Sequence, residues 1–380
     1  MKVNLQIARG LAALSVFLFH MKGMLAESFP ALAKLVQFGD LGVPLFFVIS
    51  GYVITASAQA TIASRGSAHQ FMKRRFLRIY PPFWCSVAVI IVLPFFLEAL
   101  SALKTGSFAA PSPRYLALDA WGWLQLLTLT KIFAGGGVGL YREFELVNIV
   151  YWTLAIEFQF YLVAYLALLA RRHFIAVLAS TSALSLLVLA YPTGVNGGVF
   201  LHFWPMFALG IVLWYLVEHG LVLERLSSRP LLASMAILIP VSATVIGLAD
   251  QGTLRTVLDK IFPSEDLGFA VLCFLVLWAS TPIERTLAAQ RAHGGPLGSR
   301  LVRSGWFLGE ISYSLYLLHA PLLALSAAFA RQVFEAGSQG YLLTIILGTI
   351  ALCRVFYVFC ERPFSSEGRR LPMRPCVATS

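Results

Sequence analysis

The sequence predicts an all-α protein, a polytopic bundle of about ten transmembrane helices with both termini in the cytoplasm. Three observations lead to this prediction. Of the 380 residues, 58% are hydrophobic and only 12% are charged, whereas soluble domains contain about 25% charged residues. Apolar stretches long enough to cross a bilayer recur along the chain. Lys and Arg residues are concentrated in alternate connections between these stretches, as is typical of cytoplasmic loops.

Ten stretches approach the roughly 20 apolar residues that a spanning helix needs. They are 5–25, 40–60, 82–100, 147–170, 173–191, 198–218, 231–249, 266–281, 306–330 and 341–360. Residues 121–130 are apolar but too few, so we expect a re-entrant or interfacial segment there. With a cytoplasmic N-terminus, 19 of the 29 Lys and Arg residues fall in inside segments and nine fall outside. This bias predicts an even number of spans and two cytoplasmic termini.

The net charge of +11 comes mainly from basic residues beside apolar spans. We therefore expect this charge to set the topology and to contact anionic membrane lipids, and we expect no nucleic-acid partner. The five cysteines are odd in number and follow neither a metal-ligand nor a disulfide spacing. The sequence therefore predicts no metal site.

Ionisable side chains inside the spans point to function, because a charge at membrane depth is costly and normally marks a functional path. These residues are Arg9, His20, Glu157, His319 and Arg354. A rise of 1.5 Å per residue places His20 about 22 Å, His319 about 20 Å and Glu157 about 15 Å above the inner membrane edge. A basic cluster at 73–78 lies at that edge. We predict a basic mouth that leads to a deeper His/Glu centre.

Each of these residues also has a structural explanation when it is taken alone. A buried histidine can pack or hydrogen-bond without reacting. Glu157 can form a salt bridge to Arg9 or Arg354, and the basic cluster can be topogenic charge. The joint pattern at similar depth favours function.

At these positions the chain resembles the membrane-bound acyltransferase-3 family, whose members acylate sugars and antibiotics. Five segments carry the resemblance, in the family's order along nearly the whole chain. They are LQIARGLAALSVFLFH (5–20), with ten residues between Arg and His, GDLGVPLFFVISGY (39–52), RFLRIYP (75–81), with its Arg-x-x-Arg pattern, YWTLAIEFQFY (151–161), and GEISYSLYLLH (309–319). The chain departs from the family at Thr153, where Ser is usual.

The resemblance implies ten spans with cytoplasmic ends in a bacterial cytoplasmic (inner) membrane. It also implies an acyl-CoA donor, usually acetyl-CoA, and no metal. Residues 1–365 would form the acyltransferase-3 transmembrane domain, and 366–380 would form a short cytoplasmic tail. Some relatives carry a fused extracytoplasmic hydrolase-like domain, which we do not expect here.

The residues suggest a mechanism for such a transfer. Arg75 and Arg78 are three residues apart on one helical face and are predicted to bind the phosphates of acyl-CoA, helped by Arg9. His20 is predicted to deprotonate the acceptor hydroxyl, and Glu157 to orient the imidazole. An alternative in which His20 carries the acyl group covalently stays open.

Four more residues are predicted to support this centre. His319 and Tyr313 either polarise the thioester carbonyl or pack against the site, and Trp152 and Tyr161 are predicted to form walls of the acceptor site. The predicted function is transfer of an acyl group, most simply acetyl, to a hydroxyl of a cell-surface glycan or its lipid-linked precursor.

Three alternatives to this function stay open. They are acylation of a small lipophilic acceptor such as a macrolide, transfer of succinyl, and a proton-coupled transporter. The sequence shows no repeated halves, which counts against the transporter.

Overall fold

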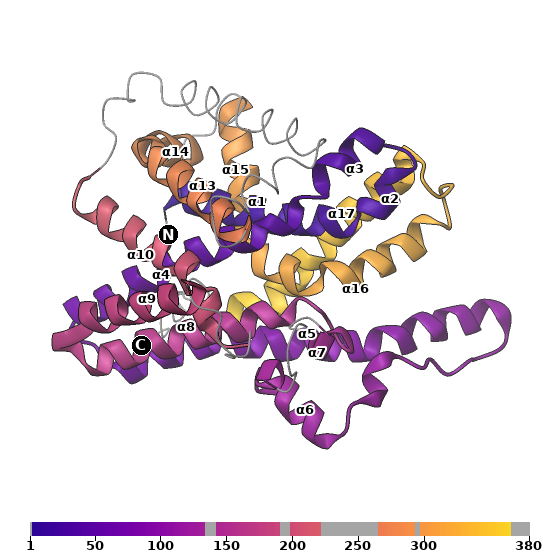
Figure 1. Cartoon of the computed structure of the whole chain (residues 1–380). Coiled ribbons are helices and arrows are strands. Elements are labelled where there is room, and N and C mark those ends of the chain that lie inside the picture. Colours follow the sequence, from indigo (N-terminus) through magenta and orange to yellow (C-terminus); the bar gives the residue numbers. More distant parts are fainter. Residues whose placement is uncertain (1, 134–141, 191–197, 222–264, 293–296, 366–380) are drawn as a thin grey trace, which may run out of the picture.

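The computed structural model describes residues 2–133, 142–190, 198–221, 265–292 and 297–365. The regular structure in these ranges is helical (Figure 1). Within the described residues, eight helical segments are long and apolar enough to cross a membrane: Val3–His20, Pro30–Ala63, Ala68–Thr105, Tyr151–Leu169, Arg171–Ala190, Asp266–Ala292, Ser312–Ala330 and Gln339–Phe364. The protein is therefore an all-α polytopic membrane protein, as the sequence predicts.

Eight of the ten predicted spans coincide with these segments. The predicted span 198–218 contains a shorter apolar helix, Trp204–Glu218, and the predicted span 231–249 lies outside the described residues, as does the predicted tail 366–380. Segment 121–130 contains only an eight-residue helix, Ala120–Leu127. The number of spans and the location of the termini stay predictions.

The helices have the following bounds. The longer ones are α1 (Val3–His20), α4 (Gly42–Ala63), α5 (Ala68–Thr105), α8 (Tyr151–Leu169), α9 (Phe174–Ala190), α10 (Trp204–Glu218), α13 (Glu265–Ala279), α15 (Leu297–Glu310), α16 (Ser312–Ala330) and α17 (Gln339–Phe356). The shorter ones are α2 (Lys22–Ala26), α3 (Pro30–Val36), α6 (Ala120–Leu127), α7 (Arg142–Glu145) and α14 (Glu284–Ala292). Short 3₁₀ turns connect them, and a π-helical turn, η8 (Tyr357–Glu361), follows α17.

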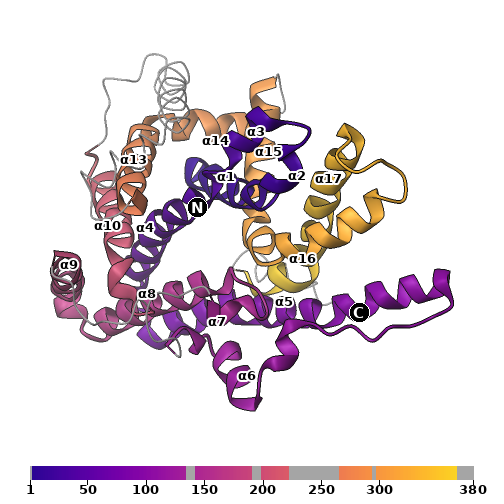
Figure 2. The ribbon, with the colours of Figure 1, turned by 45° about the vertical axis from the view of Figure 1, so that its right-hand side comes forward.

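Helices α1 and α4 form the centre of the fold. Helix α1 packs against α4, α15 and α16, and α4 also packs against α8, α10 and α13. Figure 2 shows the other helices arranged around this pair. Large apolar side chains on the outer helices, such as Val92, Leu187 and Leu347, are more than half exposed. Such an apolar outer surface is what a lipid-facing bundle presents.

Glycines allow α4 and α10 to approach closely. A Cβ atom on Gly51 would overlap the backbone of Phe207, and one on Gly210 would overlap the backbone of Val48. Helices surrounded by lipid depend on such small-residue contacts, because the hydrophobic effect does not drive them together.

Replacing Gly51 with leucine is therefore expected to destabilise the protein by about 1–3 kcal/mol, because the new side chain must push α4 away from α10. Gly23 on α2 is a matched control, since nothing lies within 4 Å of a Cβ placed there. Thermal unfolding in detergent compares the two variants. Equal melting temperatures for Gly51→Leu and Gly23→Leu would contradict the close α4–α10 contact.

Helix α5 begins earlier than its predicted span, 82–100. A capping box at Ser67 and Gln70, in which Ser67 Oγ accepts from the Gln70 N–H at 3.1 Å, starts the helix at Ala68. At 38 residues the helix is about 57 Å long, well beyond the roughly 30 Å of hydrocarbon. The basic cluster therefore belongs to the first turns of α5. Arg75 and Arg78 lie on one helical face, as predicted, and line the same cavity.

The predicted span 306–330 starts too early. Residues up to Glu310 belong to α15, and α16 starts at Ser312. Figures 1 and 2 show α15 and α16 running in different directions. Helix α15 packs along α1, where Gly309 faces the backbone of Gln6. The chain therefore changes direction between Glu310 and Ser312. The apolar pattern of the sequence does not reveal this break.

Candidate active site

Two neighbouring cavities contain nearly all of the predicted site residues. The first, of about 110 Å³, is here called the arginine cavity. Its lining includes Arg9, Ser50, Arg75, Arg78, Thr153, Glu157, Tyr161, Ser312 and Tyr313. The second, of about 380 Å³, is here called the histidine cavity. Its lining includes Phe19, His20, Asp40, Pro44, Trp152, Phe203 and Asp266.

A thin wall separates the two cavities. Val43, Phe47 and Tyr316 line both of them. The Tyr316 hydroxyl is held in this wall, because it shares a 2.7 Å hydrogen bond with the Thr153 hydroxyl and donates to the Val150 carbonyl at 3.3 Å. A single layer of side chains therefore separates the cavities.

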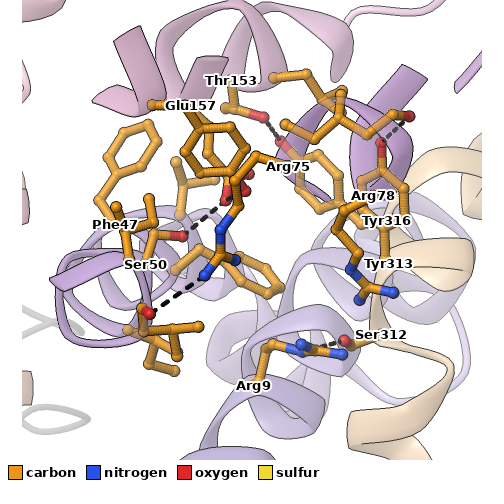
Figure 3. Close-up of a pocket in the computed structure, with 18 residues that line it drawn as sticks. Arg9, Phe47, Ser50, Arg75, Arg78, Thr153, Glu157, Ser312, Tyr313 and Tyr316 are labelled. Atoms are coloured by element: carbon orange, nitrogen blue, oxygen red, sulfur yellow. Dashed lines mark hydrogen bonds between the residues drawn. The ribbon is translucent and has the colours of Figure 1, made fainter. Parts of the chain in front are cut away.

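The three arginines predicted to bind the donor converge on the arginine cavity (Figure 3). Arg9 reaches the break between α15 and α16, where its Nε donates to Ser312 Oγ and its Nη2 donates to the Gly309 carbonyl, both at 2.7 Å. A helix C-terminus presents partly negative carbonyl groups to such a cation. The end of α15 therefore fixes the position of the Arg9 guanidinium.

Arg75 is held between two aromatic rings. Its guanidinium carbon lies 5.5 Å from the ring centroids of both Phe71 and Tyr161, within the range of cation–π attraction. Its Nη2 lies 3.4 Å from the Val53 carbonyl, at the long end of a hydrogen bond. These contacts hold the Arg75 guanidinium in the lining of the arginine cavity.

Arg78 has a charged partner that the sequence reasoning did not foresee. Its Nη1 donates to Glu361 Oε1 at 2.7 Å, and the Glu361 side chain is fully buried. The other carboxylate oxygen of Glu361 accepts from the backbone N–H and the hydroxyl of Ser314, at 3.1 and 2.6 Å. Through Glu361, Arg78 is therefore connected to η8, the turn that follows α17, and to Ser314 of α16. Glu361 directly follows the predicted span 341–360. A carboxylate at the end of an apolar span is the sequence signal that could have identified it.

Glu157 belongs to the arginine cavity and not to the His20 site. Its Oε1 accepts hydrogen bonds from Ser50 Oγ at 3.0 Å and from the Tyr161 hydroxyl at 2.8 Å. Tyr161 therefore orients Glu157. It was predicted to form a wall of the acceptor site, but it lines the arginine cavity instead. Trp152, the other predicted wall residue, lines the histidine cavity.

Helix rise explains why Glu157 and His20 lie apart. Glu157 is five residues after Trp152 on α8, about 7.5 Å along the helix axis. The depths expected from the sequence, about 22 Å for His20 and about 15 Å for Glu157, differ by about the same amount. The hypothesis that Glu157 orients the His20 imidazole does not match this arrangement.

Histidines from two helices meet at the second cavity. His20 of α1 lines it, and its ring centroid lies 4.9 Å from that of His319 of α16. His319 is fully buried, and its Nδ1 lies 3.0 Å from the Leu315 carbonyl. Tyr313 lies in the arginine cavity, where its hydroxyl donates to the Ile79 carbonyl at 2.9 Å and its ring lies 5.5 Å from the Arg78 guanidinium. The structure thus places His319 beside His20 and Tyr313 beside Arg78.

Four helices pass from one cavity to the other. Along α1 the order is Arg9 then His20, and along α16 it is Ser312 then His319. Helices α4 and α8 run the opposite way, with Pro44 before Ser50 and Trp152 before Glu157. A common axis therefore leads from the basic cavity through the Tyr316 wall to the histidines. Arg354 lies apart from this axis and pairs with Glu310 at 3.6 Å.

Comparison with known proteins identifies the family of this chain. The family model Acyl_transf_3, described as an acyltransferase domain, matches residues 2–359. The chain is 25% identical over 386 residues to the O-acetyltransferase OatA of Staphylococcus aureus (strain NCTC 8325 / PS 47), covering 95% of this chain and 56% of OatA. It is 27% identical over 377 residues to the "Putative membrane-bound transacylase BcsY" of Komagataeibacter xylinus, covering 96% of this chain and 83% of that protein.

The chain thus spans little more than half the length of OatA. No solved structure matches it. The family model, by contrast, covers nearly the whole chain, including every predicted site residue. This integral membrane protein therefore belongs to the acyltransferase domain family Acyl_transf_3.

Proposed function

We propose that this protein transfers an acyl group, most simply acetyl, from acyl-CoA in the cytoplasm to a hydroxyl of a cell-surface glycan or its lipid-linked precursor. One observation carries the proposal: a cavity lined by three arginines is separated by a single layer of side chains from a cavity lined by His20, whose ring lies beside that of His319. Membership of the acyltransferase family and the similarity to an O-acetyltransferase support the type of reaction.

The donor would bind at the arginine cavity. Guanidinium groups recognise phosphate oxygens with paired hydrogen bonds and stay charged at any working pH. A cavity of about 110 Å³ has room for about four waters at roughly 30 Å³ each, enough for a phosphate group or a slender acyl-bearing arm. The nucleotide would stay at the cytoplasmic surface, near the exposed residues Lys73 and Arg74. The thioester would then pass the Tyr316 wall to reach the histidines.

The acceptor would enter the larger histidine cavity, where Trp152 and Phe203 offer apolar walls and Asp40 and Asp266 offer hydrogen-bond acceptors. Such a lining is typical of sugar-sized ligands, which present both apolar faces and hydroxyl groups. His20 would take the proton of the acceptor hydroxyl as its oxygen attacks the thioester carbonyl. The C–O bond forms, the C–S bond breaks, and the proton leaves with the thiolate of coenzyme A.

Replacing Arg75 with glutamine is expected to raise the KM for acyl-CoA about 10- to 100-fold, the effect of losing one or two charge-assisted hydrogen bonds. Arg74 is the matched control, because it neighbours Arg75 but is exposed and donates to Thr61 instead of lining the cavity. Free thiol released from acetyl-CoA by proteoliposomes gives the KM. An unchanged KM in Arg75→Gln, or an equal rise in Arg74→Gln, would contradict donor binding in this cavity.

The acceptor is tested in cells that carry or lack the protein. We expect surface polysaccharide from the cells that carry it to contain additional acyl groups by mass spectrometry. If the polysaccharide is unchanged and small molecules carry the acyl groups instead, the acceptor is a small lipophilic molecule and not a glycan. Substrate flux without thiol release would indicate a transporter and would overturn the enzyme assignment.

A further inference from the structure

One buried nitrogen near the proposed reaction centre lacks a partner. The His319 side chain is fully buried, and its Nε2 has no hydrogen-bond partner among the described residues. Buried polar atoms are normally paired, because water has been lost and nothing else compensates for it. An unpaired nitrogen beside a reaction centre therefore calls for an explanation.

The other nitrogen of the ring fixes the tautomer of His319. Nδ1 lies 3.0 Å from the Leu315 carbonyl oxygen, and a carbonyl oxygen can only accept. Nδ1 therefore carries the hydrogen, and in the neutral ring Nε2 keeps a bare lone pair. The unpaired atom is thus a hydrogen-bond acceptor that lacks a donor.

His20 is the group that can supply this donor. In the part of the chain that the structure describes, three rings contact the His319 ring: Phe17, Tyr316 and His20, with centroids 6.3, 6.3 and 4.9 Å away. Phe17 has no polar hydrogen, and the Tyr316 hydroxyl is already bonded to Thr153 and Val150. A hydrogen bond needs about 3 Å between nitrogens, which rotation of the His20 ring can provide at this centroid separation.

We propose that His319 is the positioning residue of the reaction centre: its Nε2 accepts a hydrogen bond from one ring N–H of His20. That bond directs the second nitrogen of His20, with its lone pair, into the histidine cavity, where it takes the proton of the acceptor hydroxyl. His319 thereby takes the place that a carboxylate occupies in catalytic triads. This inference rests on the proposed function, and it assigns to His319 the role that the sequence predicted for Glu157.

The chemistry needs no further reactant. The hydroxyl proton moves to the cavity-facing nitrogen of His20, which becomes an imidazolium with both N–H groups bonded. The positive charge is shared along the bond to His319 Nε2 until the proton leaves with the coenzyme A thiolate. His319 keeps its own proton on Nδ1 throughout, since the Leu315 carbonyl holds it there.

The first test is kinetic. We expect His319→Phe to lower kcat about 10- to 100-fold with little change in either KM, and His319→Gln, which retains an oxygen acceptor, to recover part of the loss. His219 is the matched control: its Nδ1 also bonds the carbonyl four residues earlier, Tyr215 at 2.9 Å, but it is exposed and its ring stacks on Tyr215 instead of facing His20. Wild-type kcat in His319→Phe would overturn the proposal.

A double variant separates positioning from simple packing. If His319 acts through His20, then His20→Ala combined with His319→Gln loses no more activity than His20→Ala alone. If the activity losses of the two single variants instead multiply in the double variant, His319 supports the fold and does not act through His20. That outcome would overturn the proposal. Full activity of His20→Ala by itself would instead refute the proposed function.

A spectroscopic test does not depend on activity. In wild-type protein with ¹⁵N-labelled histidine, assigned by the signals lost in His319→Gln, we expect a protonated Nδ1 and an unprotonated, hydrogen-bonded Nε2 for His319. In His20→Ala the Nε2 signal should move to higher frequency as its donor disappears, whereas His219→Gln should leave it unchanged. A His319 signal that is identical with and without His20 would overturn the proposal.

Discussion

Replacing His20 with alanine is expected to reduce acyl transfer about 100- to 10,000-fold, the usual contribution of a general base. The ring lines the histidine cavity and is the cavity-facing member of the histidine pair. Without it, the acceptor hydroxyl has no base to take its proton during attack on the thioester. Transfer from labelled acetyl-CoA in proteoliposomes measures the loss, with His219→Ala as the control of equal size.

The same experiment distinguishes direct transfer from a covalent intermediate. If His20 carried the acyl group, label would stay on wild-type protein in the absence of acceptor and would be absent from His20→Ala. Direct transfer predicts no labelled protein in either case. A His20→Ala variant that melts like the wild type and transfers acyl groups at the wild-type rate would remove His20 from the mechanism.

Replacing Glu361 with alanine is expected to destabilise the protein by about 3–5 kcal/mol, because the Arg78 guanidinium would stay in the bundle without its counter-charge. The Glu361 side chain is fully buried and forms a 2.7 Å ion pair with Arg78, whose side chain is 25% exposed toward the arginine cavity. It also accepts two hydrogen bonds from Ser314 that no other group replaces. Thermal and chemical unfolding in detergent measure the loss.

A second ion pair in the same region is the control. Arg354 and Glu310 are 3.6 Å apart with side chains 38% and 26% exposed. Partly exposed pairs contribute about 0–1 kcal/mol, so Glu310→Ala should have a small effect. The double variant Arg78→Leu/Glu361→Leu should recover stability relative to Glu361→Ala, because it removes both charges. Equal losses of unfolding free energy in Glu361→Ala and Glu310→Ala would contradict the assignment of a strong ion pair between Arg78 and Glu361.

The structure groups the predicted site residues differently from the sequence-based hypothesis. Arg9, Arg75 and Arg78 were expected at one mouth, and they converge on one cavity. Glu157 was expected at His20, yet its carboxylate bonds Ser50 and Tyr161. Counting residues along a helix gives depth to within several ångströms, but it gives no information on which way a side chain points around the helix axis.

Glu361 illustrates a different limit. It follows an apolar span, so the sequence identifies it as a carboxylate near membrane depth. The neighbouring residues do not indicate which cation it pairs with. Arg78 is 283 positions away, and the two meet because η8 packs against α5. Pairing across such a separation is decided by helix packing, which depends on side-chain shape over whole interfaces.

Apolar length and the distribution of Lys and Arg by themselves determined that this chain is a helical membrane protein, because lipid tolerates no unpaired backbone and makes every spanning segment long and apolar. They also identified the ionisable side chains, since a charge is rare where it is costly. Only the tertiary structure placed Arg9 and Glu157 in one cavity and His20 in another, with Tyr316 between them, and brought the His20 and His319 rings side by side. Helix rotation and packing fix such contacts, and periodic patterns in a uniformly apolar helix leave both undetermined.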